Sequence, residues 1–323
     1  MTSGTERIET SFSVPPELSD QRLDQAVAQL MPEHSRSRIQ GWVRSGELTV
    51  NGEKRRPRDR VLVDDQVEVA AAPVAEVSWE AEAIELDIIH EDEHLIVVNK
   101  PAGLVVHPAA GHEAGTLVNA LLNHAPELER IPRAGIVHRL DKDTSGIMVV
   151  ARSLEAHTSL VEQLQERRMG REYQAVCVGE LTGGGRIDEP IGRHPKQRKK
   201  MAVVPDGRPA VTHYRLERRL GGFSHIRCQL ESGRTHQIRV HMAHINHPLL
   251  GDPVYGNRMR YPKGTDAELR AVLDGFRRQA LHAARLELAH PATDAFCEWE
   301  APLPADLQQL LGALADFSER RSL

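Results

Sequence analysis

The 323-residue sequence is poor in several residue types and patterns, and each absence excludes a class of protein. Its three cysteines, Cys177, Cys228 and Cys297, are too widely spaced for a CxxC zinc clamp, so we expect buried reduced thiols in a reducing compartment. No apolar run approaches the roughly 20 residues that cross a bilayer, and the polar N-terminus lacks the pattern of a signal peptide. The sequence favours a cytoplasmic protein with no membrane partner.

Motifs for nucleotide cofactors and an excess of positive charge are also missing. The sequence has no P-loop and no GxGxxG segment after a predicted strand, so we expect no nucleotide cofactor. Its formal net charge is −5, so nucleic-acid binding would depend on local basic patches. Two are present, KRRPRDR (54–60) and RHPKQRKK (193–200). Such runs are usually solvated loops, but two of them in a net-acidic chain favour phosphate binding.

Local signals along the chain predict two domains joined by a linker. Residues 1–17 are polar and without a clear period, which predicts a flexible arm. Within residues 18–72, apolar residues recur at the spacing of one helix face from Leu23, a second short helix fits 36–45, and Asn51-Gly52 suits a hairpin turn. We expect a compact module there, followed by a linker rich in alanine, valine and glutamate over 73–85.

The remaining part of the chain, 86–323, has the pattern of a larger domain that mixes helices and strands. A helix is expected over 154–168, capped by Ser153 and ended near Gly170. Apolar runs predict strands at 95–98, 147–151, 173–178 and 225–230.

The densest cluster of polar side chains is HRLDKDTSG (138–146), directly before the apolar strand IMVVA. Loops at the ends of buried strands often carry functional residues, because the scaffold beneath them is rigid. On spacing alone, a solvated turn with a local Arg–Asp pair explains the cluster equally well. A calcium loop built on Asp141 and Asp143 has little support, since the other ligands of that pattern are missing.

A second cluster is ESGRTHQIRVHMAHINHP (231–248), which predicts a helix capped by Thr235. Arg234 would stand at the helix entrance, where its planar guanidinium could pair with a carboxylate through two hydrogen bonds. His241, His244 and His247 repeat every third residue, which suggests a metal site, but Pro248 ends the helix and no acidic ligand lies beside them. We expect structural or RNA-facing histidines and no metal.

Several long motifs, in order along the chain, resemble one family. GIVHRLDKDTSGIMVVA (135–151) is similar to the signature of the RluA-type pseudouridine synthases, in which HRLD carries the catalytic aspartate. SRSRIQGWVRSGELTVNG (35–52) resembles an S4 RNA-binding domain, which several family members carry at the N-terminus. The resemblance extends over roughly 18–310, and its other blocks are REYQAV (171–176), GRTHQIRVHMAHINHPLLGDPVYG (233–256) and LHAARLELAHP (281–291).

The resemblance implies an α+β fold and assigns the site. The catalytic domain, 86–323, should have a central mixed, largely antiparallel β-sheet flanked by helices, and 18–72 should be a small S4-like α/β module. Asp141 becomes the catalytic carboxylate, Tyr173 lies against the target base, and Arg234 is the partner of Asp141. Arg139 would enter the RNA stack where the uridine leaves, and Ile238 would pack on the uracil.

The implied reaction breaks the bond from uracil N1 to ribose C1′, turns the base and rejoins it through C5. The target base must first leave its stack. Asp141 then acts either as a nucleophile at C1′ or uracil C6, or as a base that removes the 2′ proton to give a glycal, the route we favour. Either role needs an ionised carboxylate, which a paired arginine stabilises. Neither a metal nor a nucleotide is needed.

The resemblance also implies a substrate and partner: 23S rRNA, alone or in a pre-50S ribosomal particle, at the helix 69 stem-loop. We expect a monomer whose S4-like module holds RNA phosphates through Lys54, Arg55, Arg56, Arg58 and Arg60. Three alternatives stay open: the same chemistry on another rRNA site or on tRNA, a non-catalytic RNA-binding ribosome assembly factor, and a metal-dependent hydrolase. The presence of Asp141, Tyr173 and Arg234 together argues against the second.

Overall fold

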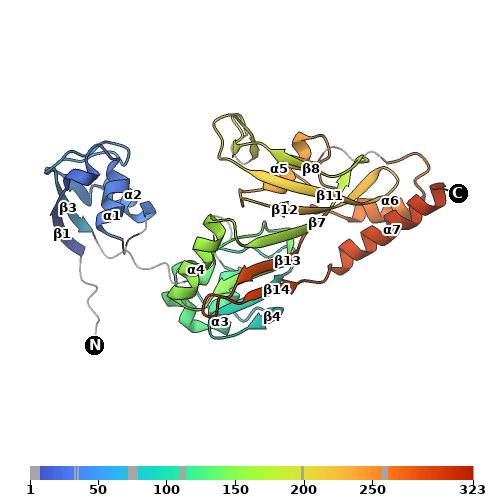
Figure 1. Ribbon diagram of the computed structural model, residues 1–323, viewed down its shortest axis with the longest axis horizontal. Helices are drawn as coiled ribbons and strands as arrows, with labels where there is room; N and C mark the ends of the chain where they lie inside the picture. The colour runs from blue at the N-terminus through green and yellow to red at the C-terminus, as the bar shows by residue number, and fades with distance from the viewer. Residues whose placement is uncertain are drawn as a thin grey trace. The chain divides into compact units, whose positions relative to one another are not determined.

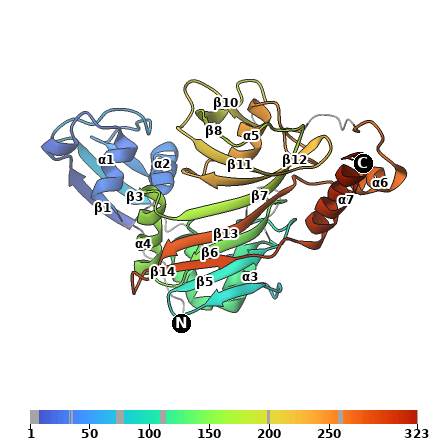
Figure 2. The same cartoon turned by 45° about the vertical axis from the view of Figure 1, so that its right-hand side comes forward.

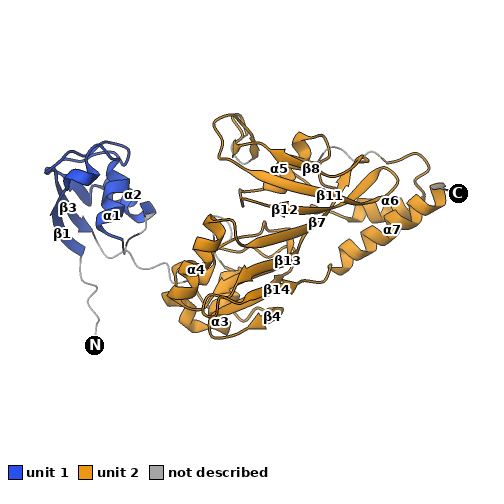
Figure 3. Cartoon of the chain, in the orientation of Figure 1, with its two compact units in different colours: residues 1–78 blue, residues 79–323 orange. Residues whose placement is uncertain are grey.

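The computed structural model describes residues 8–32, 34, 36–71, 79–108, 114–197, 200–256 and 261–322. The chain divides into two compact units, Met1–Ser78 and Trp79–Leu323 (Figure 3).

Unit 1 packs two helices against a three-stranded antiparallel sheet of order β1-β3-β2. The predicted helices are confirmed as α1 (Leu23–Leu30) and α2 (Arg36–Ser45). The strands are β1 (Ile8–Ser13), β2 (Leu48–Val50) and β3 (Gln66–Ala71), and a short 3-10 helix, η1, covers Pro16–Leu18. Trp42 of α2 is buried in the core of this unit, and β3 alternates exposed and buried residues, as expected for a sheet with one covered face.

The prediction of a flexible arm over 1–17 is wrong for residues 8–13. They form β1, which pairs with β3 from Ile8 opposite Ala71 to Ser13 opposite Gln66. Ile8 and Phe12 lie on the same side of the strand and pack against the core of unit 1, while polar residues between them conceal the pattern. Residues 1–7 lie outside the described residues.

The prediction of a linker over 73–85 is wrong for residues 79–85, which are tied to unit 2. The ring of Trp79 packs against the core of that unit. Asn119 Nδ2 donates to the Glu80 carbonyl oxygen at 2.7 Å, and the Glu82 N–H donates to the Asn119 carbonyl oxygen at 3.0 Å. Residues 73–78 lie outside the described residues.

Unit 2 is built on a nine-stranded sheet of order β4-β5-β6-β13-β7-β12-β11-β8, with β14 paired to β13. Only β6 and β13 run parallel, so the expected mixed, largely antiparallel sheet is confirmed. Figure 1 shows β13, near the C-terminal end of the chain, beside β7, and Figure 2 shows it lying between β6 and β7. The strands are β4 (Ile88–Glu91), β5 (Leu95–Lys100), β6 (Ser145–Ala151), β7 (Gly170–Val178), β8 (Gly185–Asp188), β11 (Val211–Arg219), β12 (Phe223–Leu230), β13 (Leu281–Ala289) and β14 (Phe296–Glu300).

Helices and a small hairpin complete unit 2. The hairpin pairs β9 (Ile191–Arg193) with β10 (Met201–Val203). Apolar residues of α6 and α7 share a second buried cluster with Phe223 of β12. The helices are α3 (Leu117–His124), α4 (Leu154–Gln165), α5 (Gln237–His244), α6 (Ala267–Gly275) and α7 (Ala305–Ser322), with 3-10 turns η2 (Pro126–Arg130) and η3 (Pro132–Gly135).

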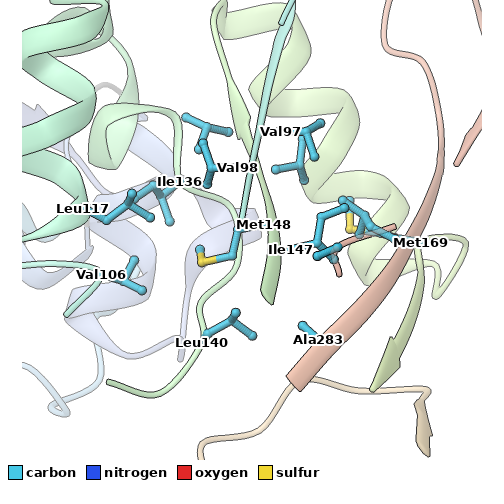
Figure 4. Close-up of a cluster of buried hydrophobic side chains, with 14 of the residues drawn as sticks. Val97, Val98, Val106, Leu117, Ile136, Leu140, Ile147, Met148, Met169 and Ala283 are labelled. Atoms are coloured by element: carbon cyan, nitrogen blue, oxygen red, sulfur yellow. The ribbon is translucent and has the colours of Figure 1, made fainter. Parts of the chain in front are cut away.

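Strand β6 is the most deeply buried strand of unit 2, because all seven of its residues are buried. Figure 4 shows Ile147 and Met148 of β6 among apolar side chains from neighbouring strands and helices. At the start of β6, Gly146 has φ +116°, and a Cβ there would lie 2.1 Å from the Ala283 carbonyl oxygen. Only glycine allows β6 and β13 to approach this closely. The loop before β6 therefore ends at a backbone position that is held by β13.

Candidate active site

The loop that precedes β6 carries Asp141 into a cavity of about 860 Å³ in unit 2. The Thr144 N–H donates to the Asp141 carbonyl oxygen at 3.1 Å and closes the turn. Gln279 Nε2 donates to Thr144 Oγ1 at 3.0 Å, which ties this turn to the segment just before β13. Asp141 therefore lies on a loop that is closed by its own backbone and tied by Thr144 to the segment before β13.

Beneath this loop lies the buried side chain of Lys100, the last residue of β5. Its Nζ donates to the carbonyl oxygens of Pro101, Leu104 and Lys142 at 2.8, 2.9 and 3.0 Å. Burial lowers the pKa of Lys100 to about 7, against the opposing charges of Asp143 and Asp141. No sequence motif singled out Lys100, whose only signal was its place at the end of an apolar strand.

The carboxylate of Asp141 is paired with Arg239, and the predicted pair with Arg234 is wrong. Arg239 Nη1 donates to Asp141 Oδ2 at 2.8 Å. Arg234 instead donates from Nε to the Pro209 carbonyl oxygen at 3.2 Å.

The cause of the error is the start of the helix. The prediction began α5 at a Thr235 cap, whereas His236 is the N-cap, in a left-handed conformation with φ 57°, and α5 starts at Gln237. Arg234 is thus in the preceding loop, where its backbone N–H donates to Gln237 Oε1 at 3.0 Å. Arg239, inside the helix, is the arginine that the fold buries.

Arg239 is itself clamped by a second carboxylate, that of Asp252. Nε and Nη2 of Arg239 donate to the two carboxylate oxygens of Asp252 at 2.7 and 2.9 Å. Asp252 also accepts the backbone N–H groups of Val254 and Tyr255. Burial would lower the pKa of Arg239, but hydrogen bonds and charge from Asp252 and Asp141 outweigh it and raise the pKa. The guanidinium is therefore a permanent cation whose orientation is fixed by its hydrogen bonds to both carboxylates. A lysine ammonium could not make the same set of bonds.

The same cavity is lined by the other residues predicted for the catalytic unit: Arg139, Tyr173, Arg234 and Ile238. Tyr173 and Ile238 are 7% and 3% exposed, so each offers only an edge to the cavity. Burial raises the pKa of Tyr173, with Arg171 opposing, which keeps its hydroxyl protonated near neutral pH. Arg139 is exposed.

Positive charge gathers at the rim of this cavity. Arg133, Arg139 and Arg167, all exposed, line it together with Arg234. Burial, helped by the charges of Arg208 and Arg167, lowers the pKa of Arg234. Like charges crowded at a cavity mouth suit an anionic ligand that would relieve their repulsion.

The basic run of unit 1 is exposed throughout, at Lys54, Arg55, Arg56, Arg58 and Arg60. Three of these side chains have protein partners: Lys54 contacts the Ser45 carbonyl oxygen, Arg55 contacts Glu53, and Arg60 contacts Asp20. In the second run, Lys200 Nζ donates to the Val254 carbonyl oxygen, and residues 198–199 lie outside the described residues.

Two histidines of the cluster at 231–248, His241 and His247, are bonded to protein groups. His241 is fully buried, and its Nδ1 and Nε2 lie 2.9 Å from Thr212 Oγ1 and 3.0 Å from the Glu189 carbonyl oxygen. His247 Nδ1 lies 3.0 Å from the Val178 carbonyl oxygen. These contacts give His241 and His247 structural roles.

Among the described helices, none combines the length and the apolar character that crossing a membrane requires.

Comparisons with known proteins place both units. The family model for RNA pseudouridylate synthases matches residues 94–244, and the model for S4 domains matches residues 21–67. The ribosomal large subunit pseudouridine synthase D of Pseudomonas aeruginosa is 57% identical over 315 residues, with 98% of each chain covered. Its Escherichia coli K12 counterpart is 50% identical over 318 residues, with 98% of each chain covered.

Two solved human structures share the fold. Human RNA pseudouridylate synthase domain containing 4 gives a TM-score of 0.56 at 28% identity, covering 70% of this chain and 92% of the other. Human RNA pseudouridylate synthase domain containing 1 gives 0.53 at 25% identity, covering 72% and 96%.

Proposed function

The chain belongs to the RNA pseudouridylate synthase family and carries an S4 domain, and from this premise we propose that it converts specific uridines of 23S rRNA to pseudouridine. The relatives' names point to the large ribosomal subunit. The expected site is the helix 69 stem-loop, in free rRNA or in a pre-50S particle. The observation that carries the proposal is the Asp141 carboxylate, held by Arg239 in a cavity that Tyr173 also lines.

The reaction requires one group that can act on the ribose and no redox partner. Asp141 takes the proton from C2′, the electrons of that bond form a C1′=C2′ glycal, and uracil leaves with the electron pair on N1. The base turns, C5 bonds to C1′, and the proton returns to C2′. N1 gains the hydrogen that C5 loses, so the product is an isomer of the substrate.

Arg239 and Tyr173 support this chemistry in different ways. Arg239 anchors one oxygen of Asp141, and its own position is fixed by Asp252. The ring of Tyr173 offers the uracil a flat contact, and its hydroxyl assists removal of the C5 proton. Ile238 packs on the uracil. These roles are the ones that the family resemblance implies, and they are supported by the fact that all these residues line one cavity.

RNA reaches the cavity across its positive rim. Arg139 lies on the loop next to Asp141 and takes the stacking position of the flipped uridine. Arg234, which does not hold Asp141, binds RNA phosphate together with Arg133 and Arg167. Unit 1 adds phosphate contacts from its exposed basic run.

The decisive experiment is Asp141→Asn, which keeps the shape of the side chain and removes its charge. Pseudouridine formation in a 23S rRNA transcript should fall to background while RNA affinity stays within a few-fold of the wild type. Mapping pseudouridines in rRNA from a deletion strain then identifies the site. Clear turnover by Asp141→Asn, or unchanged rRNA in the deletion strain, contradicts the proposal.

A further inference from the structure

The two oxygens of the Asp141 carboxylate are in different surroundings. Oδ2 accepts from Arg239 Nη1 at 2.8 Å. Oδ1 faces the imidazole ring of His236, whose Nε2 lies 3.8 Å away. A single anchored oxygen leaves the carboxylate free to turn about its last torsion, because rotation at such an sp³–sp² bond is soft. A second donor at Oδ1 would fix the plane of the carboxylate.

His236 is held in place by Tyr255, 19 residues further along the chain. Its Nδ1 lies 2.8 Å from the Tyr255 hydroxyl oxygen, and the two rings meet edge to face with centroids 5.5 Å apart. The same phenol ring lies over the Arg239 guanidinium, 5.1 Å from its centroid. Tyr255 therefore contacts both groups that face Asp141.

The hydrogen bonds of Tyr255 decide which nitrogen of His236 carries the proton. The Met201 N–H, at the start of β10, donates to the Tyr255 hydroxyl oxygen at 2.9 Å. The oxygen is thus an acceptor toward Met201, and its own hydrogen is available for His236. When the phenol donates to Nδ1, a neutral imidazole must carry its hydrogen on Nε2, the nitrogen that points toward Asp141.

We infer that His236 is a positioning residue for Asp141: the Tyr255 hydroxyl fixes its Nε2–H tautomer, and this N–H holds Oδ1 once uridine is bound. Distances of this kind shorten when the substrate fills a site, so 3.8 Å in the free protein is compatible with a later hydrogen bond. With Oδ2 on Arg239 and Oδ1 on His236, the carboxylate meets the ribose in one orientation. The inference rests on the proposed function.

The conformation and the charge state of His236 agree with this role. Its backbone is left-handed, a conformation that few side chains adopt and that is concentrated at functional sites. Burial lowers the pKa of His236, and Arg239 and Arg139 act in the same direction, while Asp141 and Asp252 oppose them. A neutral imidazole can donate to Asp141 without neutralising it, which a cationic one would do.

The first test reads the tautomer directly and needs no RNA. Two-bond ¹⁵N–¹H spectra of protein labelled in its 17 histidines should contain one Nε2–H imidazole that disappears in His236→Asn. Asparagine is chosen because it tolerates the left-handed backbone. In Tyr255→Phe the same signal should move toward a mixture of tautomers. A wild-type His236 that carries its hydrogen on Nδ1 would overturn the inference.

The second test measures catalysis with a 23S rRNA transcript at saturating concentration. His236→Asn should lower the single-turnover rate by about tenfold to a hundredfold, as expected for a loosened reacting group. Tyr255→Phe removes a hydrogen bond that favours the neutral imidazole, so the acid limb of the rate profile should move to higher pH by roughly half to one unit. Tyr261→Phe, which removes a hydroxyl bonded to Asp274, is the matched control and should leave rate and profile unchanged.

The tautomer and rate measurements distinguish a failure of the positioning role from a failure of the proposed function. A wild-type protein that forms no pseudouridine in the transcript refutes the proposed function, while the tautomer measurement still stands. An active wild type with an unshifted Tyr255→Phe profile and a normal His236→Asn rate refutes the positioning role alone. If Tyr255 had only a structural role, Tyr255→Phe would lower the melting temperature of the protein without moving the pH profile of the rate.

Discussion

Replacing Arg239 by lysine separates the geometry of the Asp141 pair from its charge. The guanidinium makes three hydrogen bonds in two directions, two to Asp252 and one to Asp141. A lysine ammonium keeps the charge but cannot span both carboxylates in this arrangement. The side chain of Asp252 is fully buried, so it would lose partners that water cannot replace.

The expected effects are large and of two kinds. Hydrogen bonds to charged groups contribute about 1.5–3 kcal/mol each, so the loss of two lowers the free energy of unfolding by about 3–6 kcal/mol. In a unit of this size, each kcal/mol corresponds to about 2–4 °C in melting temperature. A carboxylate displaced by about 1 Å costs on the order of a hundredfold in rate.

The assay compares Arg239→Lys with Arg234→Lys, an arginine of the same cavity that does not touch Asp141. Melting temperature, RNA affinity and single-turnover rate at saturating RNA are measured for both. Arg239→Lys should melt earlier and react on the order of a hundredfold more slowly, whereas Arg234→Lys should keep its rate and, at most, bind RNA less tightly. A wild-type rate for Arg239→Lys would contradict the role of Arg239 in positioning Asp141. A slow Arg234→Lys together with a normal Arg239→Lys would assign that role to Arg234.

Three further predictions concern other parts of the chain. Gly146→Ala should lower the free energy of unfolding by about 3 kcal/mol, because its Cβ would meet the Ala283 carbonyl oxygen at 2.1 Å. Gly312→Ala, which adds a Cβ in open space, should not lower it, and thermal melts of the two variants would measure the difference. Glutamine at Lys54, Arg55, Arg56, Arg58 and Arg60 should reduce the slope of log K against log salt by up to about 0.7–0.9 per lost phosphate contact, and an unchanged slope would make the run an ordinary loop. Burial lowers the pKa of His138 to about 3, and its Nε2 accepts the Val149 N–H. Between pH ~6.5 and about 3, only the unfolded chain therefore takes up this proton. Stability should therefore fall as the pH is lowered, by at most about 1.4 kcal/mol per unit, and urea titrations of His138→Gln should show a smaller fall.

The elements with strong periodicity could be predicted from the sequence. Helices α1 and α2 and the buried strands β5, β6, β7 and β12 all contain the predicted segments. Their signals are local, since an apolar run or a helical face is present in the segment itself. The placement of Asp141 beside Tyr173 in one cavity came instead from the family resemblance.

The parts that were missed depend on the start of an element or on partners distant in sequence. Arg234 and Arg239 look equivalent until the left-handed His236 decides where α5 begins. Ile8 and Phe12 become a strand only because β3 offers them an edge. The contact between His236 and Tyr255 requires the loop after α5 to fold back toward its start. No local pattern carries that information.

The parallel pairing of β6 with β13 has a consequence for the order in which the parts of the protein fold during synthesis. Ser145, at the start of β6, lies opposite His282 of β13, so these neighbours are 137 residues apart in the sequence. As the chain emerges from the ribosome, β6 and β7 lack the strand between them until residues 281–289 have been synthesised. Unit 1, whose strands and helices are complete by Ala71, can fold long before that point. The nascent protein thus acquires its S4 domain early, and the loop that carries Asp141 receives its final support only when synthesis is nearly finished.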